Sequence, residues 1–284
     1  MARANARAGA RTGSRWVSAC AAAALACAGL WTASGRADAR TPFEAPIPTY
    51  RSLDENNVNA RLPRKIHTLT LAEDSPFPLN LTTTLNPTWS VERYDVSRGR
   101  SYMHAHCGRH AKSYETLGPT AFKADLLRYC ILYTEGGVWI DDDILLVTPL
   151  DELVANMRHT LLLVYDRQVY KLAGGPKQIW NAFMVALPGS EVFARAMDKI
   201  SVNVANRAVF YHSLYYTGPA LLCESVSAND SIEFRWRMQH REGLTAKSRR
   251  IADVKTNEEV MLHFKLPRAT THYSLLSRAK DIYE

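Results

Sequence analysis

Short apolar and polar segments take turns along the chain after residue 62, and their spacing predicts alternating helices and strands. The clearest helix runs from Thr120 to Glu135, where apolar side chains recur every three or four residues before Gly136-Gly137. A second amphipathic helix is predicted over residues 191–206. Short apolar or alternating runs predict strands over residues 66–71, 88–96, 138–140, 144–147, 161–164, 181–187, 232–238 and 260–264.

This order of elements predicts an α/β sandwich built around a mostly parallel central sheet. No repeat and no low-complexity tract interrupts it after residue 62, so residues 63–284 are expected to form one domain. Residues 41–62 are polar and contain prolines, which is typical of a stem or linker. In sheets of this kind, ligands bind at the carboxyl ends of the strands.

Residues 1–40 have the composition of a targeting segment. They contain six arginines and one acidic residue, and the strongly apolar part, Val17–Trp31, is fifteen residues long and rich in alanine. Such a segment fits either a type II signal anchor or a signal peptide cleaved near Ala37-Asp38-Ala39, and an organelle transit peptide is a third interpretation. We therefore expect a protein of the secretory pathway, attached to the membrane through this segment if it stays uncleaved and secreted if it is cleaved.

The targeting segment also explains the basic character of the chain. Of the formal net charge of +7, six Arg and one Asp in residues 1–40 contribute +5, which leaves about +2 for the rest. Because the excess charge does not lie on the folded part, binding to nucleic acid is not indicated.

The cysteines after residue 40 are Cys107, Cys130 and Cys223. In an oxidising compartment one pair can form, and we favour Cys107–Cys223, with Cys130 buried on a helix, although spacing alone does not establish the pairing. Glycosylation sequons begin at Asn80 and Asn229 and favour the same compartment weakly.

Three consecutive carboxylates, Asp141–Asp143, directly follow the predicted strand Val138–Ile140. Because like charges repel, the cluster is either a solvated turn or a site for a cation. Mg²⁺ and Mn²⁺ prefer oxygen ligands and are commonly held by one or two carboxylates together with substrate phosphates. In an extended segment, residues i and i+2 point to the same side. Asp141 and Asp143 are therefore expected to face one metal ion.

The preceding helix adds a charged pair to this cluster. Asp125 and Arg128 are three residues apart and share a helix face, and the same helix leads through Gly136-Gly137 to the aspartates. The glycines are expected to let the backbone turn sharply and to leave room for a ligand.

The run from Ala124 to Asp143 resembles the DXD-containing sugar-binding region of glycosyltransferase family 32, a group that includes the yeast Golgi α-1,6-mannosyltransferase and inositol-phosphoceramide mannosyltransferases. The family pattern is roughly S-D-x-x-R-Y-x-x-L-y-x-x-G-G-x-Y-x-D-x-D. Here Ala124 replaces the usual Ser and Trp139 the usual Tyr. Weaker similarity covers about residues 62–222.

The resemblance implies a GT-A-like nucleotide-binding fold and a metal-dependent, retaining glycosyltransferase of the Golgi membrane. The enzyme would move a hexose from a nucleotide-diphosphate sugar to a glycan or glycolipid, with Mn²⁺ or Mg²⁺ as cofactor. Catalysis would depend on Asp125, Arg128 and Asp141. The donor would be bound by Asp125, Arg128, Gly136, Gly137, Asp141 and Asn181, and the metal by Asp141, Asp143 and a late histidine, for which we favour His272 over His263.

Two other functions compete with this interpretation. A non-catalytic nucleotide-sugar or carbohydrate-binding member of the same fold is suggested by the absence of any Trp after Trp236, because many family members end in a Ser-Trp pair. A Mg²⁺-dependent phosphohydrolase would need a nucleophilic Asp directly after the first strand, and the segment AEDSPF after Leu71 fits this poorly. Because both Asp141 and Asp143 are present, we favour the enzyme.

Overall fold

The computed structural model describes residues 58–70, 79–166, 179–240, 248–264 and 282–283. The predicted targeting segment and most of the predicted stem lie outside these ranges. Val58 and Leu62 are buried in the domain core, so the folded part begins before Pro63, the boundary predicted from the sequence. Within the described ranges, no helix is long and apolar enough to span a membrane.

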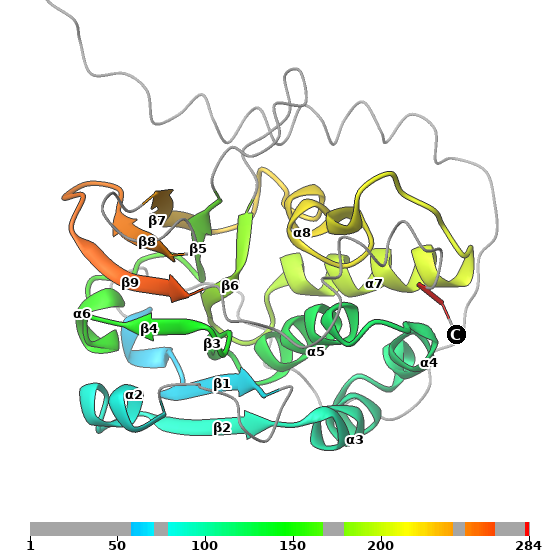
Figure 1. Ribbon diagram of the computed structural model, residues 1–284, viewed down its shortest axis with the longest axis horizontal. Helices are drawn as coiled ribbons and strands as arrows, with labels where there is room; N and C mark the ends of the chain where they lie inside the picture. Colours follow the sequence, from blue (N-terminus) through cyan, green and yellow to red (C-terminus); the bar gives the residue numbers. More distant parts are fainter. Residues whose placement is uncertain (1–57, 71–78, 167–178, 241–247, 265–281, 284) are drawn as a thin grey trace, which may run out of the picture.

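A nine-stranded sheet with the order β2-β1-β3-β6-β5-β7-β8-β9-β4 forms the centre of the domain (Figure 1). The predicted strands are present, and one further strand, β8, comes from a polar segment that shows no strand pattern. The strands are β1 (Lys65–Leu69), β2 (Ser90–Tyr94), β3 (Gly137–Ile140), β4 (Ile144–Leu146), β5 (Leu161–Tyr165), β6 (Ile179–Ala186), β7 (Ile232–His240), β8 (Ser248–Asp253) and β9 (Glu259–Phe264).

The α/β fold class is confirmed, but the expectation of a mostly parallel sheet is wrong. β1 runs parallel to β2 and β3, and β5 runs parallel to β7. The other five neighbouring pairs are antiparallel. Strands that are buried on both faces have the same apolar pattern in either direction, so the sequence pattern does not report strand direction.

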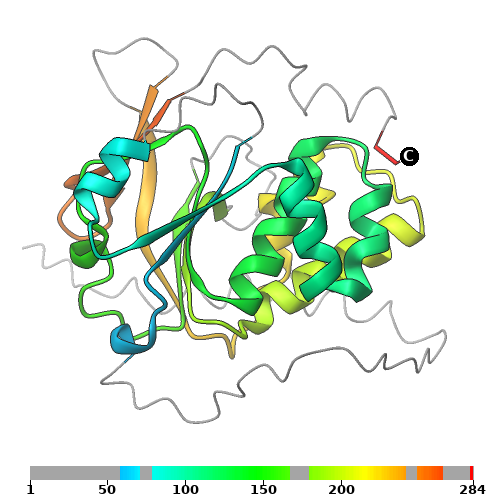
Figure 2. The same ribbon diagram turned by 90° about the horizontal axis from the view of Figure 1, so that it is seen from below.

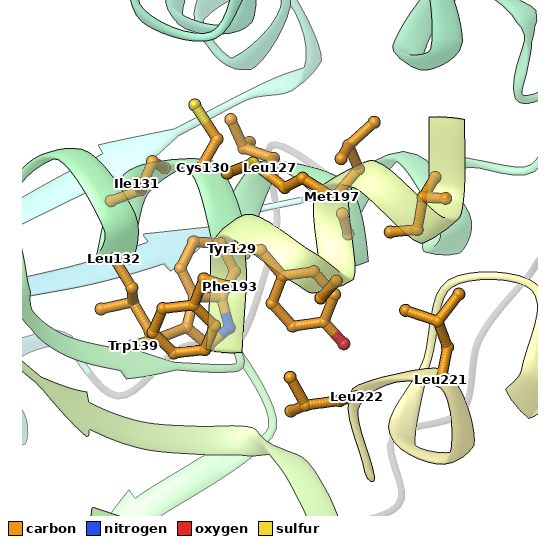
Figure 3. Close-up of a cluster of buried hydrophobic side chains, with 14 of the residues drawn as sticks. Leu127, Tyr129, Cys130, Ile131, Leu132, Trp139, Phe193, Met197, Leu221 and Leu222 are labelled. Carbon is orange, nitrogen blue, oxygen red and sulfur yellow. The ribbon is translucent and has the colours of Figure 1, made fainter. Parts of the chain in front are cut away.

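The helices are α2 (Leu79–Leu85), α3 (Val96–His106), α4 (Gly108–Thr116), α5 (Thr120–Thr134), α6 (Leu150–Leu153), α7 (Glu191–Ala205) and α8 (Pro219–Glu224). The helices α3, α4, α5, α7 and α8 cover one side of the sheet, whereas α2 and α6 lie on the other side (Figures 1 and 2). The core on the helix side includes the fully buried rings of Tyr129, Trp139 and Phe193 (Figure 3). A second core on the opposite face contains Phe183 and Trp236.

A disulfide joins Cys107, at the junction of α3 and α4, to Cys130 on α5. Cys223 is a buried free thiol on α8. The predicted Cys107–Cys223 pairing is therefore wrong. Sequence spacing gave no means to choose between the partners, because the choice depends on how α4 and α8 pack against α5.

Gly136 and Gly137 connect α5 to β3 with positive φ angles of 67° and 91°, which favour glycine. A Cβ atom on Gly137 would lie 2.6 Å from the carbonyl oxygen of Lys65, and one on Gly136 would lie 2.6 Å from Cδ of Pro188. Protein atoms therefore occupy the space that we expected a ligand to use. Both residues also lie at the opposite end of β3 from Asp141, so the structure gives them a role in chain packing, and donor binding by Gly136 and Gly137 stays a prediction.

Candidate active site at the end of β3

The three aspartates form a turn at the end of β3. The Ile144 N–H donates to the Asp141 carbonyl over 3.2 Å, which is the i to i+3 hydrogen bond of a β-turn. The Asp141 N–H donates to the carbonyl of Ala182 on β6 over 2.9 Å. The extended geometry from which we predicted the directions of Asp141 and Asp143 is therefore absent, although the cluster lies at a strand end as expected.

Arg128 lies at the centre of the site. Its side chain is 6% exposed, and Nη2 lies 3.4 Å from Oδ1 of Asp125 and 3.3 Å from Oδ1 of Asp141. Nη1 donates to the main-chain carbonyl of Asn181 over 2.6 Å. The charged pair Asp125 and Arg128 of α5 thus lies beside the aspartate turn, as their spacing predicted. A single guanidinium connects α5, the β3 turn and β6.

Asp125 is held from two further elements. Its Oδ1 accepts from the Asn181 side-chain amide over 2.9 Å, and its Oδ2 accepts from the Thr217 hydroxyl over 2.8 Å. The Tyr129 hydroxyl links the same partners, because it accepts from the Asn181 amide and donates to the Thr217 carbonyl, both over 3.0 Å. A Cβ on Gly218 would lie 3.3 Å from Oδ2 of Asp125, so the glycine keeps the start of α8 close to this carboxylate.

Asp141 accepts a hydrogen bond of 2.7 Å from the Trp139 indole N–H. About a quarter of its side chain remains exposed. Burial raises the pKa of Asp141 to about 6, although the Arg128 guanidinium acts in the opposite direction. Burial also raises the pKa of Asp125, again opposed by Arg128. Both carboxylates thus carry a desolvation cost that a single guanidinium only partly offsets.

Asp143 lies beside a histidine from the other end of the chain. Its Oδ2 is 3.3 Å from Nε2 of His263, which the β4–β9 pairing places opposite Ile144. The His263 Nδ1 is buried without a hydrogen-bond partner. His272, which we favoured as the late histidine, lies outside the described residues. No sequence signal connects residues 143 and 263, because only the strand pairing brings them together.

The residues present fit a divalent cation in their chemistry. Asp143 supplies carboxylate oxygens, which suit Mn²⁺ and Mg²⁺, and His263 supplies an imidazole nitrogen beside them. Asp125, Asp141 and Asp143 carry three negative charges when ionised, against one positive charge on Arg128. Over the part of the chain that the structure describes, no three His, Cys, Asp or Glu side chains are arranged to hold a metal by themselves.

Residues 73–160, which contain Asp125, Arg128 and the aspartate turn, match the family model described as a glycosyltransferase sugar-binding region containing a DXD motif. The chain is also 32% identical over 138 residues to glycosyltransferase afumC of Aspergillus fumigatus (strain CBS 144.89 / FGSC A1163 / CEA10). That alignment covers 45% of this chain and 32% of the relative, so the chain spans about a third of that protein's length. The chain therefore carries a glycosyltransferase-like sugar-binding region.

Two solved structures are similar at low identity. PaToxG glycosyltransferase has 14% sequence identity and a TM-score of 0.41, over 60% of this chain and 73% of that one. The UDP-bound glycosyltransferase domain from the YGT toxin has 11% identity and a TM-score of 0.33, over 50% of this chain and 52% of that one.

The assembled site differs in membership from the predicted one. Asp125, Arg128, Asp141 and Asn181 are joined by direct contacts, and Asp143 lies at the same turn. Thr217, which no prediction assigned to the site, contacts Asp125 directly, and His263 takes the position beside Asp143. Both contacts depend on the packing of segments far apart in the sequence.

Proposed function

We propose that the chain is a metal-dependent, retaining glycosyltransferase that moves a hexose from a nucleotide-diphosphate sugar to a glycan or glycolipid acceptor. The observation that carries this proposal is the buried Arg128 shared by Asp125 and Asp141. Such an arrangement fixes carboxylate oxygens at defined positions beside a cationic group. Fixed hydrogen-bond acceptors of this kind suit the hydroxyl groups of a sugar. A site built to bond hydroxyl groups also rejects ligands that lack them.

Each side chain has a definite role in this proposal. Asp125, held by Asn181 and Thr217, accepts hydrogen bonds from hydroxyls of the donor sugar and orients the anomeric carbon. Arg128 holds Asp125 and Asp141 in place beside the sugar. Asp143 and His263, with Asp141 next to them in the turn, would hold Mn²⁺ or Mg²⁺. When bound, the cation supplies Lewis-acid stabilisation of the departing diphosphate.

Two features support a location in the secretory pathway. The Cys107–Cys130 disulfide is of a kind that persists in oxidising compartments. Asn80 and Asn229, the first residues of the two sequons, are both exposed. Together with residues 1–40, these features favour a type II Golgi membrane protein, with a secreted form as the alternative.

The test is donor hydrolysis by the full chain with a panel of nucleotide sugars, with and without Mn²⁺. We expect turnover of at least one donor, dependent on the metal and abolished by Asp143→Asn and by Asp125→Asn. The matched control is Asp198→Asn, which changes an exposed aspartate on α7 that pairs with Arg109. It should turn over donor like the wild type.

A non-catalytic binding member of the same fold is the competing function. It predicts that a nucleotide sugar binds, with affinity reduced by Asp125→Asn, while no donor is hydrolysed or transferred under any metal condition. If the Asp143→Asn variant turned over donor at the wild-type rate, the metal site would be assigned wrongly. The anomeric configuration of the product, read by NMR at early times, tests retention separately.

A further inference from the structure

Within β7, the side chains change the face of the sheet toward which they point. Phe234 packs with the core on the helix side, whereas Trp236 is buried in the opposite core. In a regular strand, residues two apart point to the same side of the sheet. Phe234 and Trp236 point to opposite sides, so the strand must contain one additional residue between them. The pairing with β5 shifts at this point, because Leu163 pairs with Phe234 and the next residue, Val164, pairs with Trp236. Arg235 is therefore the extra residue of a β-bulge.

The bulge directs the next polar side chains toward the helix side of the sheet. Met238 is buried in the opposite core, so its neighbours Arg237 and Gln239 point the other way. On β8, Arg250 pairs with Gln239, and its neighbour Ile251 is buried in the opposite core, so Arg250 shares that direction. Without the bulge, Arg237 would point into an apolar core. Bulges that re-aim side chains in this way are common beside active sites.

Neutral groups hold these two arginines in place. Arg250 donates through Nε and Nη2 to Oε1 of Gln239, over 2.9 and 2.6 Å. Oδ1 of Asn257 accepts from Nε2 of Gln239 over 2.9 Å and from Nη2 of Arg237 over 3.3 Å. No carboxylate among the described residues pairs with either guanidinium. We call Arg237, Gln239, Arg250 and Asn257 the β7–β8 basic face. No described carboxylate compensates its two positive charges, and the described residues occupy only a minority of its N–H donors.

The β7–β8 basic face lies on the same side of the sheet as the candidate active site. Asn181 on β6 reaches Asp125 of α5, so its side chain points toward the helices. Ile179 of β6 pairs with Tyr165 of β5, and Tyr165 pairs with Arg237 of β7. Figure 1 shows β5 between β6 and β7. With neighbouring strands about 4.8 Å apart, Arg237 lies on the order of 12 Å from Asn181.

An aromatic surface lies between the two sites. The rings of Tyr165 and Phe234 are stacked, with centroids 4.2 Å apart, and both are only partly buried. A ligand that extended from Asn181 to Arg237 would pass Tyr165, which lies between them in the sheet. This spacing suits a ligand that carries an anionic group some distance from its reacting end.

We propose that the β7–β8 basic face binds a phosphate group, and that the glycosyl acceptor is a phosphate-bearing molecule. Guanidinium groups donate bidentate hydrogen bonds to phosphate oxygens. Arg237 and Arg250 occupy diagonal positions on paired strands, where Cβ atoms are about 7–8 Å apart, so both reach one anion. The assignment of this phosphate to the acceptor rests on the proposed function. The phosphate binding itself does not depend on that function.

The test measures phosphate binding by the full chain in EDTA, which removes the metal that the donor diphosphate needs. The probes are glycerol 3-phosphate and phosphatidylcholine vesicles containing phosphatidic acid, with glycerol and pure phosphatidylcholine vesicles as blanks. Arg237→Gln and Arg250→Gln should each weaken binding at least tenfold, and the double variant should abolish it. The matched control is Arg93→Gln, an exposed arginine on β2 whose partner is likewise neutral, the Thr70 hydroxyl. It should bind like the wild type.

The two probes separate the sources of the phosphate, because a free phosphomonoester predicts binding of the first and a lipid headgroup predicts binding of the second. The proposal would be overturned if the wild-type protein bound neither probe. It would also be overturned if the arginine variants were folded and bound as tightly as the wild type. Donor hydrolysis should be unchanged in these variants. If the wild type binds phosphate through these arginines but hydrolyses no donor, the proposed function fails while the phosphate site stands.

Discussion

The Trp139 indole N–H donates to Asp141 Oδ1 over 2.7 Å, from a position two residues earlier in the same segment. The Trp139 ring also lies under the Arg128 guanidinium, with Cζ 5.3 Å from its centroid. Trp139 is fully buried, so it fixes both charged groups from the core side. The residue that replaces the Tyr of the family pattern therefore takes part in the site.

Replacing Trp139 by Phe should keep a ring in the core and remove the hydrogen bond to Asp141. A bond to a charged group contributes about 1.5–3 kcal/mol, so urea unfolding should show a loss of that order. Donor hydrolysis should fall roughly tenfold, because the Asp141 carboxylate loses its fixed orientation.

Trp89→Phe is the matched control, because the Trp89 indole also donates to an aspartate, Asp151, over 3.0 Å. Trp89 belongs to the core on the opposite face of the sheet. Its variant should lose comparable stability and keep full hydrolysis. Equal loss of activity in both variants would show that Trp139 acts only through stability.

Arg128→Met should be the most destabilising change in the site. It leaves the partly buried carboxylates of Asp125 and Asp141 without their shared cation, and breaking a buried ion pair in this way costs about 3–5 kcal/mol. Arg128→Lys keeps the charge but loses the planar fork that reaches both carboxylates and the Asn181 carbonyl. It should unfold at higher urea than Arg128→Met and still show no measurable donor hydrolysis. Wild-type turnover in Arg128→Lys would mean that only the charge is needed.

The unit that carries Asp125, Arg128 and Asp141 was predictable because it is local. A helix pattern, two glycines and a short strand are consecutive in sequence, and they fix how the helix returns over the aspartates. The positions of Thr217 and His263 were not predictable, because they depend on where α8 and β9 pack. The choice of Cys130 over Cys223 as disulfide partner has the same origin.

The sequence left a turn at Asp141–Asp143 open as one alternative, but the predicted side-chain directions assumed an extended segment. Three aspartates after a strand are compatible with an extended continuation and with a turn, and the hydrogen bond from Ile144 N–H decides between them. Strand direction was misjudged because buried strands show the same apolar pattern in parallel and antiparallel sheets.

His263→Gln should weaken Mn²⁺ binding if this side chain completes the metal site with Asp143. The glutamine keeps similar size and polarity but lacks the imidazole nitrogen that would ligate the metal. Calorimetry with Mn²⁺ and a nucleoside diphosphate should show at least tenfold weaker binding, with unchanged unfolding in urea. His159→Gln changes a histidine that contacts Ser231 and should bind like the wild type. Unaltered Mn²⁺ affinity in His263→Gln would remove His263 from the site.

His110 should make the fold less stable in mild acid. Burial lowers its pKa to about 4, from an ordinary value of 6.5, and the Arg109 guanidinium acts in the same direction. The unfolded chain therefore takes up a proton near pH 6.5, while the folded chain does so only near pH 4. Between these values the unfolded state binds more protons, so stability is complete above about pH 6.5 and declines as the pH falls toward 4. His67, whose pKa burial also lowers to about 4, acts in the same direction.

The variant His110→Asn tests this contribution by urea unfolding from pH 7.5 to 4.5. It should be less stable at neutral pH by about 1–3 kcal/mol, because His110 bonds with Ser201 and Arg109. Its stability should then decline less steeply with acid than that of the wild type. If the stability of His110→Asn and that of the wild type declined equally steeply with acid, His110 would take up its proton at the same pH in the folded and unfolded states.

The Cys107–Cys130 disulfide should stabilise the helix that carries the charged pair. It closes a loop between residues 23 apart in sequence, for which restriction of the unfolded chain corresponds to about 3 kcal/mol. The double variant Cys107→Ser/Cys130→Ser should therefore unfold at clearly lower urea than the wild type. Both sulfurs belong to buried residues, so dithiothreitol should reduce the bond in native protein only slowly, at a rate that rises with urea. Cys223→Ser is the control: it changes a buried free thiol and should lose only about 1 kcal/mol. The bond would be excluded if the double variant were as stable as Cys223→Ser. It would also be excluded if the wild-type protein, apart from the cysteines of residues 1–40, released three thiols to a thiol reagent.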